Sequence, residues 1–261
     1  MKNNKIIEIN HASVLRGNKK ILNDVSFSIE SKGHTVILGP NGSGKSTLLK
    51  LLTKELYPVS DKNTYIKLFN NEINDIFELR KRIGILSDNF YEVFSLDITG
   101  TELVLSGFFA STAVFSIHKV SIEMKKKALR IIDFLELSHI AERALETMSS
   151  GEINRFFLAR TIVNDPAILI LDEPTANLDM KSADKFLSYI EKLSKTTTIV
   201  IVTHNLSDIT PSIKKVIMLK HGSIFFSGKK DDGLKSNIIS KLFNYKINVI
   251  KKNKYYYAIK K

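Results

Sequence analysis

The sequence predicts an α/β fold in which a mixed sheet is flanked by helices. Short apolar runs typical of strands alternate with segments whose apolar residues recur at helical spacing, as expected of a layered α/β core. Residues 167–172, AILILD, form a continuous apolar run of the kind that is buried in a parallel sheet. A glycine-rich loop at 39–47 joins the strand-like run 35–39 to a helical run, as in a βα unit.

Segments with the composition of strands come in two groups, which a long helical stretch separates. Each segment is short, rich in β-branched or aromatic residues, and bounded by turn residues. The segment 214–228 predicts an antiparallel β part that turns at His221 and Gly222. The other predicted strands are residues 5–9, 25–29, 35–39, 65–69, 83–86, 167–172 and 197–204.

Helical periodicity dominates the middle of the chain. Apolar residues recur at helical spacing after the glycine-rich loop, over residues 97–144 and over 180–194. We therefore predict a single domain over residues 1–228, in which an all-α insertion occupies about residues 90–155. Residues 229–261 are predicted to form a basic C-terminal extension, in which the run KYYYAIK adds either a strand or a small regulatory piece.

The composition excludes several classes of protein. The chain has no cysteine, which rules out disulfides and cysteine-based metal or redox chemistry. The N-terminus lacks the apolar core of a secretory signal. No run reaches the roughly 18 apolar residues of a membrane span, and the apolar run 103–117 is too short for one. We therefore expect a soluble, cytoplasmic protein that needs another subunit if it serves a membrane.

The formal net charge of +12 has two interpretations. A basic surface is suited to nucleic acid or to anionic lipid headgroups, whereas a general lysine bias only adds solvated charge. We favour the second interpretation, because the lysines are scattered along the chain. The dense patch is the tail, KINVIKKNKYYYAIKK, which holds six lysines and no acidic residue.

The strongest chemical signal is the segment GPNGSGKST, which fits the pattern G-x-x-x-x-G-K-[ST] between a strand and a helix. The backbone N–H groups of such a loop and the N-terminus of the following helix form a nest for phosphate groups. Lys45 is expected to reach the β- and γ-phosphates and the Ser46 hydroxyl to bind Mg²⁺. The alternative is a glycine-rich turn that binds nothing, which the flanking strand and helix disfavour. The predicted phosphate-binding residues are Gly39, Pro40, Asn41, Gly42, Ser43, Gly44, Lys45, Ser46 and Thr47.

A second signal is ILILDEPT at residues 168–175, a buried strand that ends in two acidic residues. A carboxylate at the C-terminal end of such a strand lies where α/β sheets bind ligands, so we expect Asp172 to hold Mg²⁺ through water. Glu173 is then expected to orient or deprotonate the attacking water. The alternative, two solvated acids at a strand end, is disfavoured by the phosphate-binding loop upstream.

From about residue 5 to about residue 228, the chain resembles the ATP-binding cassette (ABC) family. The family signature LSGGQ is matched by MSSGE at 148–152, followed by Arg155, Ala159-Arg160 and Pro166 in NRFFLARTIVNDP. The resemblance implies a P-loop NTPase core with an inserted all-α signature subdomain. It also implies roles in ATP binding or hydrolysis for Ser149, Ser150, Gly151, Glu152, the D-loop residue Asp179 and the switch histidine His204.

Four positions depart from the family pattern. The slot of the adenine-stacking aromatic holds Arg16, which either stacks on the base through its guanidinium or is a solvated turn residue. The slot of the Q-loop glutamine, a metal ligand in the family, holds Asp88, which brings a negative charge. In the signature, Glu152 replaces a glutamine and Ser150 replaces a glycine, and the added Cβ of Ser150 near the phosphate is expected to slow closure.

The resemblance also implies partners and cofactors. Two ATP, each with Mg²⁺, would lie between this chain and a second copy of it or a homologous ABC subunit, each site completed by the signature helix of the partner. Hydrolysis would open the pair and move a transmembrane permease, so the chain would be peripheral on the inner face of the cell membrane. The apolar segment 103–115 is either the surface on which the permease docks or the insertion's own core.

The leading functional prediction is the ATPase subunit of an ABC transporter, similar to a bacterial branch linked to molybdate-type or metal uptake. The alternative is a cytosolic, non-transport ABC ATPase that acts on nucleic acid or ribosomes. The single P-loop and the short helical insertion count against that alternative, so nucleic acid is not expected as a partner. A third possibility, a nucleotide sensor without turnover, is disfavoured by Glu173 and His204, which a sensor does not need.

Overall fold

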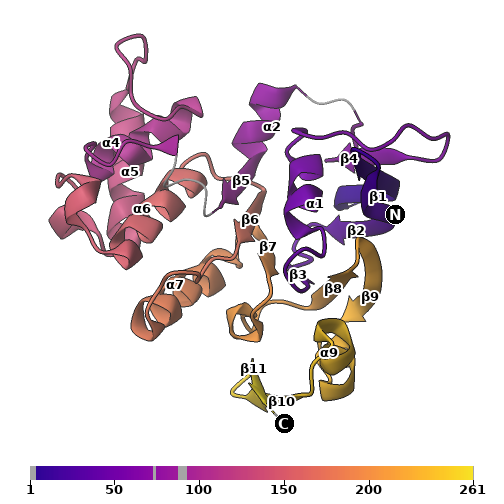
Figure 1. The fold of residues 1–261 in the computed structure, drawn as a ribbon. Helices are drawn as coiled ribbons and strands as arrows, with labels where there is room; N and C mark the ends of the chain where they lie inside the picture. Colours follow the sequence, from indigo (N-terminus) through magenta and orange to yellow (C-terminus); the bar gives the residue numbers. More distant parts are fainter. Residues whose placement is uncertain (1–3, 73–74, 88–92, 261) are drawn as a thin grey trace. The chain divides into compact units, whose positions relative to one another are not determined.

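A computed structural model describes residues 4–72, 75–87 and 93–260 of the chain (Figure 1). The chain divides into two compact units, each of which is described by itself. The first comprises residues 1–74 and 198–261, and the second comprises residues 75–197. Within the described residues, no helix combines the length and the apolar character that crossing a membrane requires.

The first unit begins with a three-stranded antiparallel sheet. Its strands are β1 (Lys5–Arg16), β2 (Lys19–Glu30) and β4 (Tyr65–Leu68), in the order β2–β1–β4. Gly17 adopts a left-handed backbone (φ 58°) in the two-residue turn between β1 and β2, which lets the two strands pair along their whole length. For that reason both strands extend well beyond the predicted runs 5–9 and 25–29.

A second sheet of the first unit carries the phosphate-binding loop. Parallel strands β7 (Thr198–Thr203), β3 (Thr35–Leu38) and β8 (Lys215–Lys220) lie side by side in that order, and β9 (Ser223–Lys229) pairs antiparallel with β8. All residues of β3 and β7 are buried, as their apolar runs predict. The predicted turn is confirmed, because His221 and Gly222 both have positive φ. Helix α1 (Lys45–Leu52) follows β3.

The C-terminal extension also belongs to the first unit. It contains α8 (Lys230–Gly233), α9 (Ser236–Phe243), β10 (Ile247–Lys252) and β11 (Tyr255–Lys260), and the last two strands form an antiparallel hairpin, drawn in yellow in Figure 1. The run KYYYAIK therefore supplies a strand, β11. Its partner β10 and the helices were not predicted from the sequence.

The second unit contains a parallel strand pair and a group of helices. Strand β5 (Ile83–Leu86) pairs with β6 (Ile168–Asp172), and both were predicted. The helices are α2 (Ile76–Arg82), α4 (Gly100–Ser106), α5 (Ile122–Phe134), α6 (Ser150–Ile162) and α7 (Met180–Leu193). The second unit also contains the short 3₁₀ helices η1 (Gly107–Phe109), η2 (Ser138–Ile140) and η3 (Leu145–Thr147). A further one, η4 (Leu206–Asp208), belongs to the first unit.

Helix α4 packs closely on α6. A Cβ atom at Gly100 would lie 2.4 Å from the ring of Phe156, so only glycine allows this approach. Leu103, Val104 and Leu105 are buried, which makes the first part of segment 103–115 the core of the helical region. The end of the segment differs, because Phe115 is 53% exposed. The core alternative therefore holds for the first part of the segment, and permease docking stays a prediction for its exposed end.

Arg160 ties α6 to the chain that follows α4. Its guanidinium donates hydrogen bonds to Ser106 Oγ (3.2 Å) and to the carbonyl of Ser111 (2.9 Å), and it lies 4.5 Å from the centre of the Phe94 ring. Burial lowers the pKa of Arg160 to about 10, which leaves the side chain charged at neutral pH. Arg160, the arginine of the Ala159-Arg160 pair in the family pattern, thus has a structural role in this chain.

Candidate functional site

The loop between β3 and α1 has the backbone of a phosphate-binding loop. Gly42 and Gly44 have φ of 75° and 106°, in the range that L side chains rarely adopt. Gly39 is needed for space, because a Cβ there would lie 2.5 Å from the carbonyl of Leu219 and 2.6 Å from Ser43 Oγ. Gly44, which has no side chain, is the N-cap of α1. The first N–H groups of α1, which have no partner within the helix, are therefore not capped by a side chain and are suited to phosphate oxygens.

Lys45 lies within this loop. Its side chain is 7% exposed, and its ammonium donates to the carbonyls of Gly39 (2.8 Å) and Pro40 (3.3 Å). The Ser43 hydroxyl is also buried, and among the described residues it has no hydrogen-bond partner. A buried hydroxyl without a partner costs about 1–3 kcal/mol, so a phosphate oxygen at this point would remove an existing penalty. The loop thus places one cation and one unsatisfied hydroxyl where the sequence predicts phosphate binding.

Three neighbouring segments of the first unit hold the loop in place. Gly39 N donates to the carbonyl of Thr203 (3.3 Å), the last residue of β7, and the exposed His204 follows directly. Gly222 N donates to the carbonyl of Ser43 (3.1 Å), which connects the loop to the β8–β9 turn. A Cβ at Gly44 would lie 2.7 Å from Leu22, so β2 lies directly against the loop.

The remaining predicted site residues of the first unit lie around these contacts. Ser46 is exposed and Thr47 half-buried in the first turn of α1, while Asn41 is exposed in the loop. Arg16 is the exposed last residue of β1 and pairs with Lys19 at the start of β2. The same strand β2 contacts the loop through Leu22, three residues further along. Asp88 lies outside the described residues.

Asp172 and Glu173 end strand β6 in the second unit, and both are half-buried. Glu173 has a left-handed backbone (φ 47°), which is uncommon for a residue with a side chain. Asn154 of α6 donates from its side-chain amide to the carbonyl of Pro174 (3.1 Å). The signature helix is therefore fixed directly to the segment that carries Glu173.

The signature residues form the start of α6. Ser149 is the N-cap, and Glu152 closes a capping box with it: Ser149 N donates to Glu152 Oε2 (2.8 Å), and Ser149 Oγ accepts from Glu152 N (3.4 Å). Ser150 is exposed in the first turn of the helix. The departure from glutamine to glutamate at position 152 therefore preserves the geometry of the helix start, since both residue types close this box.

Gly151 and Asp179 meet at one side chain. Asp179 is the N-cap of α7, and its carboxylate accepts from Ser182 N (3.1 Å) and Ser182 Oγ (2.6 Å). A Cβ at Gly151 would lie 2.8 Å from the same Ser182 Oγ. Sequence reasoning missed Ser182 and Asn154. The spacing Asp179-x-x-Ser182 is that of a helix N-cap and could have revealed the first, whereas no local signal marks Asn154.

The capping box makes a pH-dependent contribution to stability. The Ser149 hydroxyl, followed by its N–H, lowers the pKa of Glu152 below its ordinary value of 4.5. Because the folded-state pKa is the lower one, the stabilisation is present above pH 4.5 and is lost as the pH falls through the folded-state pKa. We expect Glu152→Gln to lower the free energy of unfolding at pH 7 by about 0.5 kcal/mol and to flatten the fall of this free energy as the pH drops below 4.5.

Urea unfolding of the full chain at several pH values measures this effect. The exposed Glu146 provides a matched control, because Glu146→Gln removes the same charge without touching the capping box. Parallel pH profiles for wild type and Glu152→Gln would show that the capping box has no such role.

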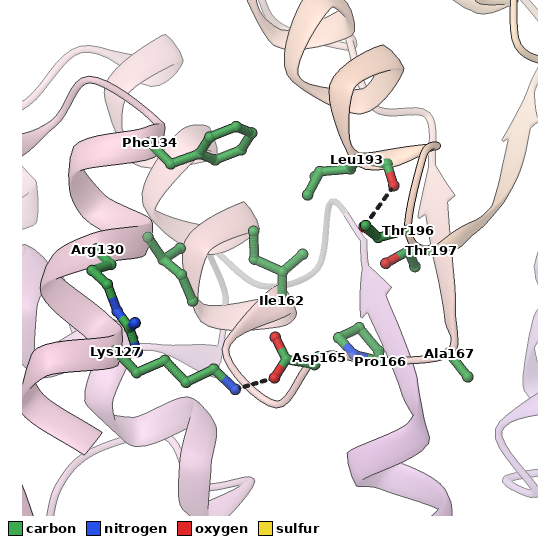
Figure 2. A pocket seen from close by; sticks show the side chains of 11 residues that line it. Lys127, Arg130, Phe134, Ile162, Asp165, Pro166, Ala167, Leu193, Thr196 and Thr197 are labelled. Atoms are coloured by element: carbon green, nitrogen blue, oxygen red, sulfur yellow. Dashed lines mark hydrogen bonds and ion pairs between the residues drawn. The ribbon is translucent and has the colours of Figure 1, made fainter. Parts of the chain in front are cut away.

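A cavity of about 660 Å³ lies elsewhere in the second unit (Figure 2). Figure 2 shows Phe134 of α5, Ile162 of α6 and Leu193 of α7 around it, with Lys127 paired to Asp165 at its edge. Ala167, which also lines the cavity, precedes β6, whereas Asp172 ends that strand. The cavity therefore lies at the opposite end of β6 from the acidic pair and contains none of the predicted site residues.

The family comparison decides the identity of the chain. The family described as "ABC transporter" matches residues 22–176, which includes both the phosphate-binding loop and the acidic pair. The chain belongs to the ABC transporter family. It is thus the ATP-binding and ATP-hydrolysing subunit of an ABC transporter, and the resemblance drawn from the motifs is confirmed.

Individual relatives of this cassette agree in length as well as in sequence. It is 32% identical to the ABC transporter ATP-binding protein YlmA of Bacillus subtilis strain 168, over 94% of this chain and 93% of that protein. It is 30% identical to the hemin import ATP-binding protein HmuV of Aliivibrio fischeri strain ATCC 700601 / ES114, over 92% and 91%. The similarity therefore covers more than nine-tenths of the chain.

Solved structures confirm the fold of the cassette. A nucleotide-free ATP-binding cassette of an ABC transporter has a TM-score of 0.79 and 25% identity, covering 91% of this chain and 97% of its own. A dimeric cassette in a post-hydrolysis state, bound to ADP and phosphate, has a TM-score of 0.69 and 26% identity, covering 85% and 98%. The α/β prediction with an antiparallel sheet is therefore correct.

Proposed function

We propose that two copies of this cassette, or one copy and a homologous subunit, clamp two ATP and drive a transmembrane permease at the inner face of the cell membrane. The observation that carries the proposal is the loop at the start of α1, which holds the Lys45 ammonium and the buried Ser43 hydroxyl. A dimeric relative with ADP and phosphate supports the pairing of two cassettes.

Each predicted site residue then has a role toward the nucleotide. Lys45 and backbone N–H groups within residues 41–47 bind the phosphates, and Glu173 activates water while His204 contacts the γ-phosphate. Ser149 and Gly151 of the partner copy complete the site, with Ser150, Glu152 and Asp179 shaping that edge. Arg16, on the strand hairpin whose β2 contacts the loop, stacks on the adenine.

The donor set fits Mg²⁺. Ser46 offers a hydroxyl at the exposed start of α1 and Asp172 a half-buried carboxylate, and oxygen ligands of this kind are those that Mg²⁺ prefers alongside phosphate oxygens. Asp88 would be a further oxygen ligand. Bound Mg²⁺ would neutralise charge on the transferred phosphoryl group, while Ser46 and Asp172 hold it in position.

The helical region offers a surface for the permease. Phe115 and Ile117 are 53% and 82% exposed in the chain that follows α4, whereas Leu103, Val104 and Leu105 within α4 belong to the core. Exposed apolar side chains of this kind often mark an interaction site. The named cargo of HmuV is hemin, so import of a metal-containing compound is the transport class that we propose.

Purification from solubilised membranes of the native host tests this function. We expect the tagged full chain to retain a hydrophobic membrane protein, and Phe115→Ser to lose it while still binding ATP. Ile122→Ser is the matched control, since Ile122 is similarly exposed (67%) at the start of α5. Recovery of ribosomes or DNA in place of a membrane protein would favour the non-transport alternative and overturn the proposal.

A further inference from the structure

A second cavity, of about 610 Å³, lies in the first unit where the C-terminal extension meets β8 and β9. Residues from three segments line it: Pro211, Ile213, Lys214, Lys229, Lys230, Asp231, Asp232, Lys251 and Lys254. Lys214 precedes β8, whereas Leu219, near the other end of that strand, lies against the phosphate-binding loop. Five strand residues correspond to about 16 Å, so this lysine cavity is separate from the ATP site.

The charge of the lysine cavity is unbalanced. Five ammonium groups and two carboxylates line it, which leaves a net charge of +3. Both carboxylates already have partners: Asp231 accepts from Lys251 (2.8 Å) and from the Tyr256 hydroxyl, and Asp232 pairs with Lys235 (3.5 Å), which lies outside the cavity. Among the residues that the structure describes, Lys214, Lys229 and Lys254 form no ion pair. Ammonium groups that line one cavity repel one another, and a bound anion would relieve that repulsion.

The backbone fixes the positions of these lysines. Lys230 N donates to the carbonyl of Lys214 (2.8 Å), and the Lys230 ammonium donates to the carbonyls of Thr210 (3.3 Å) and Pro211 (3.2 Å). Lys254 lies in the tight β10–β11 turn, where it and Asn253 have positive φ. Tyr256, only 3% exposed, anchors the hairpin through its contact with Asp231. The backbone around the cavity is thus held by folded elements, while the side chains of Lys214, Lys229 and Lys254 are exposed.

The lining indicates the chemical class of the ligand. A volume of about 610 Å³ lies within the range of about 300–1,000 Å³ that is typical of small-molecule sites. Lysine ammonium groups bind phosphate as point charges, and several of them suit an anion with several charges. Apolar lining is limited to Pro211 and Ile213, which gives a nucleobase little surface to stack on.

We propose that the lysine cavity binds a small oligophosphate, either an inorganic chain or the phosphate chain of a nucleotide. Such a ligand would connect the end of β9 to the C-terminal hairpin through its contacts with Lys229 and Lys254. The extension would then be a second anion-binding element of the cassette, distinct from the ATP site.

Calorimetric titration of the full chain with sodium tripolyphosphate tests this proposal. The Lys45→Ala background removes the contribution of the ATP site. We expect one bound tripolyphosphate per chain in that background and at least a tenfold weaker affinity after Lys214→Glu and Lys229→Glu. The exposed Lys125 and Lys126 of α5 provide the control: Lys125→Glu with Lys126→Glu changes the net charge equally and should leave the affinity unchanged.

Further arms of the experiment separate the possible outcomes. Lys229→Gln with Lys254→Gln relieves repulsion without reversing charge, so these changes should weaken binding while the melting temperature is maintained.

A tighter affinity for ATP than for tripolyphosphate in the same background would support a nucleotide as the source, and equal affinities would support an inorganic chain. Absence of binding, an equal loss in the α5 control, or binding of a short RNA without binding of tripolyphosphate would overturn the proposal. If instead the assignment of the phosphate-binding loop were wrong, Lys45→Ala would not remove binding at the ATP site. A second site for tripolyphosphate would then remain in that background, and the cavity variants would leave it intact.

Discussion

Lys45→Ala is expected to weaken ATP binding by the full chain severely and to prevent hydrolysis. The Lys45 ammonium is buried within the loop and donates to the carbonyls of Gly39 and Pro40, so it is held close to the N-terminus of α1. Truncating one partner of a buried charge pair costs about 2–5 kcal/mol, which weakens binding roughly 30-fold or more. Equilibrium binding of a fluorescent ATP analogue, measured with Mg²⁺ present, determines the change.

Lys50→Ala is the matched control for this prediction. Lys50 lies on the same helix, is exposed, and carries the same charge, so its loss should leave ATP affinity unchanged. Circular dichroism of both variants establishes that α1 is intact. Wild-type affinity in Lys45→Ala, with the helix folded, would contradict the assignment of the loop as the phosphate site.

The parts of the site that could be predicted from sequence depend on short-range patterns. The loop at 39–47 needs glycine at 42 and 44 because of local backbone angles, and that requirement is visible in a few consecutive residues. The buried strands β3, β6 and β7 each consist of a short run of mostly apolar residues, as expected of strands buried in a parallel sheet. Such elements are specified locally, and their boundaries agree with the prediction to within a residue or two.

The parts that could not be predicted depend on long-range contacts. Strand β10, INVIKK, has a lysine-rich end and becomes a strand because β11 pairs with it and Ser236 accepts a hydrogen bond from Val249 N. Similarly, the glycine at 151 was predicted to touch phosphate, but its close approach to Ser182 depends on how α6 meets α7. Strand propensity and motif matching do not contain these contacts, because the partners are distant in sequence.

In the signature, the change from glutamine to glutamate at position 152 has two opposite effects. Glu152 replaces the glutamine of the family pattern, and the structure shows that it closes a capping box with Ser149. A carboxylate in the first turn of a helix is favourable for the helix dipole, whereas the same charge near a γ-phosphate is unfavourable. The two effects have opposite signs, so Glu152→Gln is expected to cost stability while making ATP-dependent closure easier.

Glu173→Gln is expected to trap the cassette as an ATP-bound dimer. Glutamine has almost the same shape as glutamate, so the half-buried side chain after β6 and its left-handed backbone should be retained. It cannot accept a proton from water, however, and the loss of general-base assistance typically lowers the rate by 10²–10⁴-fold. ATP binding itself does not need the base, and removing a negative charge near the phosphates favours it. Bound ATP should therefore persist between the two copies in place of being hydrolysed.

Light scattering with ATP and Mg²⁺ measures this outcome directly, and the wild type under the same conditions should remain largely monomeric. The exposed Glu55 supplies the control, because Glu55→Gln removes an equal charge at the end of the α1 region without touching β6. A Glu173→Gln chain that binds ATP yet stays monomeric would mean that the two copies do not share their nucleotides. A nucleotide bound by one copy alone takes every phosphate contact from that chain. A nucleotide shared by two copies also contacts the N-terminus of the partner's signature helix, which is a second anion-binding site.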